Sequence, residues 1–83
     1  MPHYYFHAEQ GGKRTLDKEG SHLSDWHNAQ AHAVRAAADL AAEDLKRGRR
    51  RVEHIILVEN QTGLDIIRVR VSALLEVQAI RTA

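Results

Sequence analysis

The chain of 83 residues has no cysteine, so neither a disulfide nor a zinc site built on thiolates can stabilise it. It has no apolar run near the ~18 residues that a membrane span needs, and its first residues lack the apolar stretch of a signal peptide. Charge of one sign is not in excess, because 12 Lys and Arg residues are balanced by 11 Asp and Glu residues. These absences predict a cytoplasmic protein without membrane contact, and the net charge indicates no class of partner.

The small size of the chain predicts a single domain over residues 1–83. A domain of this size buries only a little over ~60% of the surface that its unfolded chain exposes, so its hydrophobic core is marginal. Oligomerisation is a common way to stabilise so small a core when disulfides are absent. We therefore expect a homo-oligomer.

Residues 24–48 form the longest periodic stretch and predict one amphipathic helix. Ser24 is suited to be its N-cap, and Gly48 can end it in the left-handed conformation. Alanines dominate the apolar face, which allows the helix to lie close to a sheet, and Trp26 is expected to anchor the first turn in the core. The residues on this face are Trp26, Ala29, Ala33, Ala37, Leu40 and Ala41.

Strand character occurs on both sides of this helix. Residues 3–8 predict a first strand, a glycine turn follows, and residues 13–16 predict a short edge strand before a loop over 17–22. Residues 52–60 predict the most regular strand, and residues 64–71 predict the last one. The order β-β-α-β-β predicts an α+β fold with an antiparallel sheet packed on one helix. Residues 72–83 fit a short helix, an extension of the last strand or an exposed interaction tail.

Apolar residues occur on both faces of the last two predicted strands, whereas one helix can cover only one face of a sheet. The second face therefore needs a cover, either the C-terminal segment or a second subunit. We predict a homodimer through this face or through the sheet edges. The residues that we assign to its interface are Ile55, Leu57, Ile67 and Val69.

The densest run of charge follows the helix. Its functional interpretation is phosphate contact with nucleic acid, which Arg68 and Arg70 would strengthen if they lay nearby. The simpler interpretation is a solvated helix end, and no aromatic side chain lies within the run to stack on bases. The residues of this basic cluster are Lys46, Arg47, Arg49, Arg50 and Arg51.

The remaining reactive side chains form no known catalytic pattern. His3 and His7 lie on one strand face about 13 Å apart, too far to share a metal ion, and no His-Glu-x-x-His sequence occurs. Asp39 and Glu43 lie on the predicted solvent face of the helix. We expect no catalytic residue, no metal and no cofactor, and the sequence identifies no small-molecule ligand. His7 is the histidine whose strand position favours burial.

Short motifs appear in a characteristic order along the chain. Tyr4-Tyr5-Phe6-His7 comes first, Gly11-Gly12 follows, Asp17-Lys18-Glu19-Gly20 precedes the alanine-rich helix, and residues 58–63 end a late strand. Over roughly residues 2–71 this order resembles a family of small bacterial domains of unknown function that open Tyr-Tyr-Phe-His. The resemblance implies a compact bacterial cytoplasmic domain without a known substrate. Members usually carry Asp at the position of Asn60.

The order of strands and helix is also similar to the partial ferredoxin-like domain of HicB-type antitoxins, in topology only. The sequence thus predicts a non-catalytic, homo-oligomeric interaction module. The alternative is a nucleic-acid-linked regulatory or antitoxin-like protein that uses the basic cluster of residues 46–51.

Overall fold

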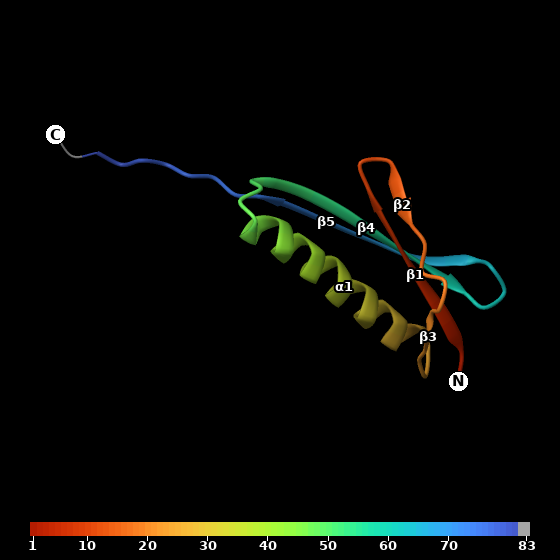
Figure 1. The fold of residues 1–83 in the computed structure, drawn as a ribbon. Helices are drawn as coiled ribbons and strands as arrows, with labels where there is room; N and C mark the ends of the chain where they lie inside the picture. Colours follow the sequence, from red (N-terminus) through yellow and green to blue (C-terminus); the bar gives the residue numbers. More distant parts are fainter. Residues whose placement is uncertain (82–83) are drawn as a thin grey trace.

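The structure is a computed structural model that describes residues 1–81. It has the predicted α+β fold, in which one helix lies across one face of an antiparallel sheet (Figure 1). The predicted order of two strands, a helix and two strands is confirmed, with one short strand added where a loop was expected. The elements are β1 (His3–Gln10), β2 (Lys13–Thr15), β3 (Ser21–His22), α1 (Trp26–Lys46), β4 (Arg51–Asn60) and β5 (Asp65–Leu74).

The sheet has the strand order β2-β1-β4-β5, and β3 pairs with the other end of β1, on the same side as β2. Every pair is antiparallel. The long strand β4 is central because β1 and β5 pair along its two edges. β5 is therefore the last strand on its side of the sheet.

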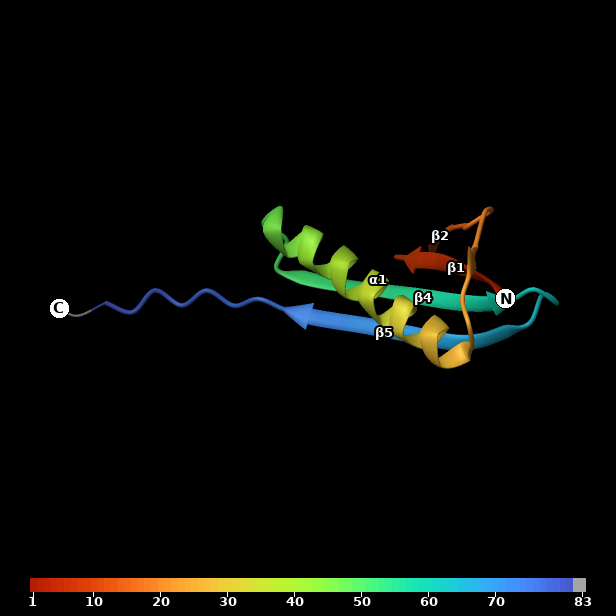
Figure 2. The ribbon, with the colours of Figure 1, turned by 90° about the horizontal axis from the view of Figure 1, so that it is seen from below.

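The hydrophobic core lies between α1 and the sheet, where α1 runs over β4 and β5 (Figure 2). Alternate residues of β4, from Val52 to Val58, point toward the helix and are buried. The buried alanines recur every four residues along α1, as the sequence predicted, and their small side chains let the helix approach the strands. The central core residues are Tyr4, Ala29, Ala33, Ala37, Ile56 and Val58.

The start of α1 differs from the prediction. The N-cap is Asp25, whose carboxylate accepts the backbone N–H of Asn28 at 2.9 Å, and not Ser24. Trp26 is 51% exposed and stacks on His27, so the prediction that it anchors the core is wrong. The reason is helical periodicity, because the four-residue stripe that begins at Ala29 extends backward to Asp25 rather than to Trp26.

The C-terminal segment leaves the domain. β5 continues to Leu74, so the strand-extension interpretation is right for residues 72–74. Residues 75–81 form neither helix nor strand and run away from the sheet (Figures 1 and 2), while residues 82–83 of that prediction lie outside the described residues. No helix within residues 1–81 has the length and apolar character needed to cross a membrane.

Candidate interaction surface

The face of the sheet opposite α1, here called the open face, is not covered by a helix in the part of the chain that the structure describes (Figure 2). Strand register places its apolar residues in the middle, with charged residues toward both ends of β4. The open face carries Tyr5, His7 and Glu9 from β1, Arg51, Glu53, Ile55, Leu57 and Glu59 from β4, and Arg68, Arg70, Ser72 and Leu74 from β5.

The four residues assigned to an interface from the sequence do not share one surface. Ile55 and Leu57 lie on the open face and are half-buried. Ile67 and Val69 pair with buried residues of β4, so they point toward α1 and pack against the core. Grouping Ile67 and Val69 with Ile55 and Leu57 is therefore wrong, because the register of β5 on β4 places these pairs on opposite faces.

An ion pair links β4 to β5 on the open face. Arg70 donates to Glu53 Oε2 from Nη2 at 2.7 Å and from Nε at 3.1 Å, and the Ser72 hydroxyl donates to the same oxygen at 3.4 Å. The hydrogen bond and the charge of Arg70 hold the pKa of Glu53 below its ordinary value. Both side chains are at least half exposed, so the pair adds little stability and chiefly orients Arg70.

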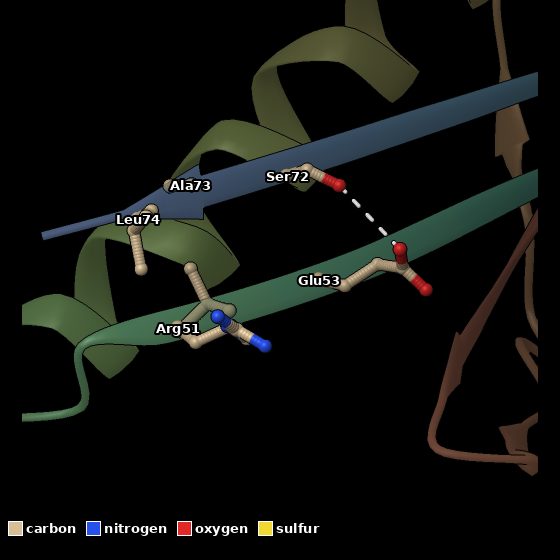
Figure 3. A pocket seen from close by; sticks show the side chains of 6 residues that line it. Arg51, Glu53, Ser72, Ala73 and Leu74 are labelled. Carbon is tan, nitrogen blue, oxygen red and sulfur yellow. Dashed lines mark hydrogen bonds between the residues drawn. The ribbon is translucent and has the colours of Figure 1, made fainter.

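A shallow hollow of about 520 Å³ lies beside this ion pair, where the sheet ends and the C-terminal segment begins (Figure 3). Residues from both faces of the sheet line the hollow, so the side chains do not fill the space around the last residues of β5. The lining residues are Arg51, Val52, Glu53, Ser72, Ala73 and Leu74.

The sheet edge formed by β1 is closed. β2 and β3 pair with the two ends of β1. Between them the Asp17 carboxylate accepts the backbone N–H of Phe6 at 3.1 Å and that of Gly20 at 3.0 Å. Partial burial alone would raise the pKa of Asp17, but the N–H groups of Gly20, Phe6 and Glu19 outweigh it and lower the pKa. The loop of residues 16–20 thus takes the place of a strand.

The opposite edge, formed by β5, is open. No strand of residues 1–81 pairs with its outer side, and β5 is 10 residues long. The backbone N–H of Leu75 donates to Arg50 O at 2.7 Å, so the backbone hydrogen-bonding groups of Leu75 point to the β4 side of the strand. The direction of the backbone N–H and C=O groups alternates along an antiparallel strand, so these groups point toward β4 in the odd-numbered residues of β5. The N–H and C=O groups of Arg68, Arg70, Ser72 and Leu74 therefore point outward.

The basic cluster lies at the end of α1 and the start of β4, and all of its side chains are exposed. Arg49 Nε lies 4.0 Å from Asp44 Oδ1. Arg51 and Arg70 are both on the open face, but their places in the sheet are about 13 Å apart and Glu53 lies between them. Arg68 and Arg70 therefore do not extend the cluster into one continuous basic patch.

His7 is buried, as its strand position favoured, and it has a structural contact. Its Nδ1 accepts the backbone N–H of Asp17 at 3.1 Å, so the ring proton lies on Nε2, which is 3.6 Å from Glu59 Oε1. His3 and His22 approach at 3.1 Å between ring nitrogens. Within residues 1–81, no group of three or more His, Asp or Glu side chains is placed to hold a metal ion.

A buried polar cluster connects α1 to the sheet. His54 Nε2 donates to Asp44 Oδ2 at 2.7 Å, and the Gln10 amide donates to the same oxygen at 3.1 Å. This cluster was not expected from the sequence. Two signals in the sequence indicate that both side chains are buried, because His54 shares a face of β4 with the buried Val52, Ile56 and Val58, and Asp44 follows the buried stripe of α1.

We expect Asp44→Asn to change the stability of the protein in acid. The hydrogen bond from His54 lowers the pKa of Asp44 below its ordinary 3.8, since the bound carboxylate is favoured in the folded state. A lowered folded-state pKa gives stability that is present above 3.8 and lost as the pH falls through the lower folded value. Urea unfolding at neutral and acid pH should show a shallower acid loss for the variant, with exposed Asp39→Asn as the control. Identical pH profiles for the wild type and Asp44→Asn would refute this role.

Asn60 organises the turn between β4 and β5. Its Oδ1 accepts the backbone N–H of Thr62 at 3.1 Å, the Thr62 hydroxyl at 2.7 Å and the backbone N–H of Leu64 at 2.9 Å. Each of these contacts needs only an oxygen, so an Asp at this position can make them too. We expect Asn60→Asp to change unfolding free energy by less than about 0.5 kcal/mol and Asn60→Ala to cost about 1 kcal/mol. Equal losses in thermal melts of the two variants would show that the oxygen is not what matters.

Comparisons with curated proteins and with solved structures return no match, so the topological similarity to HicB-type antitoxin domains stays a prediction. A comparison with family models matches residues 3–72, from the start of β1 into β5. This range includes all the motifs on which the resemblance rests, from the Tyr4-Tyr5 strand to the Asn60 turn. The chain therefore belongs to the family described as a domain of unknown function, DUF6894.

Proposed function

We propose that the protein is a homo-oligomeric interaction module without catalytic activity. The observation that carries this proposal is the open edge of β5. Its outward backbone groups have no partner within residues 1–81, whereas residues 13–22 close the opposite edge of the sheet. A long unpaired edge strand is a template for pairing with another chain, and proteins usually cover or shorten such edges. Here one edge is protected and the other is available.

Exposed apolar residues next to this edge support the same proposal. Leu74, Leu75, Val77 and Ile80 are 59%, 42%, 65% and 87% exposed, and they follow one another along the end of β5 and the C-terminal segment. Burial of apolar surface contributes roughly 25 cal/mol per Å². A second copy that covered this segment would therefore add burial to a protein whose own core is small.

Light scattering at low and high salt tests the proposal. We expect a dimer or larger assembly whose mass does not change with salt, because backbone hydrogen bonds and apolar contacts are screened little. A monomer over the whole range of attainable concentrations would overturn the proposal.

A second candidate function is nucleic-acid contact, favoured by the exposure of the whole basic cluster at one end of the molecule. The triple replacement Arg49→Ser, Arg50→Ser and Arg51→Ser separates the two candidates. An interaction module keeps its assembly mass, whereas a nucleic-acid binder loses affinity uniformly over sequence. Band shifts of the wild type with short DNA and RNA at low salt are the direct measurement, and the absence of a shift would remove this candidate.

A further inference from the structure

We infer that two copies of the chain pair along β5, antiparallel about a two-fold axis at Ser72. Residues 75–77 of each copy then continue β5 and pair with residues 67–69 of the other copy. This inference rests on the proposed function and assigns its interface.

Backbone geometry restricts the ways in which two β5 strands can pair. The outward hydrogen-bonding groups belong to Arg68, Arg70, Ser72 and Leu74, as the bond from Leu75 to Arg50 requires. An antiparallel pair exchanges hydrogen bonds between residues that face each other, so these even-numbered residues must pair with one another. A two-fold axis at Ser72 meets this condition. Ser72 then faces Ser72 of the second copy, and Arg70 faces Leu74.

Side-chain chemistry favours the axis at Ser72. On the helix side of the sheet, this register pairs apolar residues with apolar residues throughout. On the open face it places Arg68 opposite Glu76, and Arg68 has no carboxylate within ion-pair distance in residues 1–81. Cross-strand pairs of opposite charge and pairs of apolar side chains stabilise antiparallel strands. The apolar pairs are Ile67 with Val77, Val69 with Leu75, and Val71 with Ala73.

The other registers compared lose the pairing of Arg68 with Glu76. An axis at Arg70 sets this arginine against its own copy, and an axis at Val69 sets Arg68 against Arg70, so like charges face each other. An axis at Ala73 pairs Glu76 with Arg70, which Glu53 already binds at 2.7 Å, and leaves Arg68 opposite Gln78. Only the register at Ser72, among those compared, gives both Arg68 and the apolar C-terminal residues a complementary partner.

The pairing also accounts for the course of the C-terminal segment. Residues 75–81 run past the end of the sheet in the line of β5 (Figure 2), and Leu75 and Val77 are exposed there. A two-fold axis perpendicular to the sheet keeps the helices of both copies on the same face and joins the two sheets into one. Leu75 and Val77 then lie beside the partner's Val69 and Ile67 and lose their exposure.

Disulfide crosslinking tests the register, because the natural chain has no cysteine and a single introduced one has no competitor. In Ser72→Cys the two cysteines face each other with Cα atoms about 5.5 Å apart, within the range of a disulfide. In the control Leu74→Cys, on the same face of β5, the two cysteines are about 13 Å apart along the strand. Mild oxidation should crosslink Ser72→Cys at least tenfold faster than Leu74→Cys.

Truncation after Leu74 provides a second measurement that does not depend on oxidation. Loss of residues 75–83 should raise the dissociation constant of the dimer at least tenfold while leaving the helix content of the domain unchanged. Equal crosslinking of the two cysteine variants, or a truncated chain that dimerises like the wild type, would overturn the β5 interface. If the wild type still gives a dimeric mass in that case, the proposed function stands with another interface, whereas a monomeric wild type would overturn both.

Discussion

Gly20→Ala is expected to lower the free energy of unfolding by about 3 kcal/mol. Gly20 has a φ of +69°, a conformation that costs an L-residue about 1–2 kcal/mol. A Cβ at this position would also meet the His3 ring and lie 2.7 Å from the backbone carbonyl of Tyr4. That carbonyl belongs to β1 where it pairs with β3, so it can move only by disturbing the closed edge of the sheet.

Urea unfolding measures this loss, and Gly63→Ala is the matched control. Gly63 has a φ of +87°, yet a Cβ there would have no atom within 4 Å, so only the backbone strain applies. We expect the control to lose about 1–2 kcal/mol. Equal losses at the two glycines would show that the close approach of the loop to β1 does not contribute to the loss of unfolding free energy.

Ala33→Leu is expected to destabilise the protein by about 2–3 kcal/mol. Ala33 is completely buried in the core beside Ile56 and Val58, where the alanine stripe sets how close α1 lies to the sheet. A leucine would force the helix away from β4 and weaken the contacts of its neighbours along the stripe.

The matched control for this prediction is Ala38→Leu, since Ala38 is exposed on the same helix. Leucine is nearly as good a helix former as alanine, so the control should change stability by less than about 0.5 kcal/mol. Thermal melts of both variants provide the comparison. If Ala33→Leu melted like the wild type, close packing of the helix on the sheet would be refuted.

The motif residues of the family have contacts that stabilise this fold. His7 and Asp17 connect β1 to the loop of residues 16–20, Gly20 lets that loop approach β1, and Asn60 forms the turn before β5. Each contact lies within the chain. The motifs therefore explain how the β1 edge of the sheet is closed, whereas the β5 edge is left open.

The order of elements could be predicted from the sequence because it depends on local patterns. The alanine stripe has a helical period, and β4 alternates strictly between the two faces of the sheet. Gly48 and the turn at Asn60 mark the ends of elements through conformations that few other residues adopt. These signals need no knowledge of distant contacts.

The candidate interface could be predicted only in part, because it depends on how strands pair. Alternation shows that Ile67 and Val69 share a face, but only the register on β4 shows which face that is. The register shifts between Val58 and Glu59, an irregularity that the sequence does not reveal. The contact between Asp44 and His54 likewise joins residues from two elements, and no local pattern specifies it.

Amide hydrogen exchange along β5 tests the pairing of two copies most directly. In a single copy, the N–H groups of Ile67, Val69 and Val71 face β4, while those of Arg70 and Ser72 face outward. In the assembled protein we predict slow exchange for both sets, and on dilution fast exchange should return only to the outward set. Fast exchange of Arg70 and Ser72 in a protein that light scattering shows to be assembled would contradict the β5 interface.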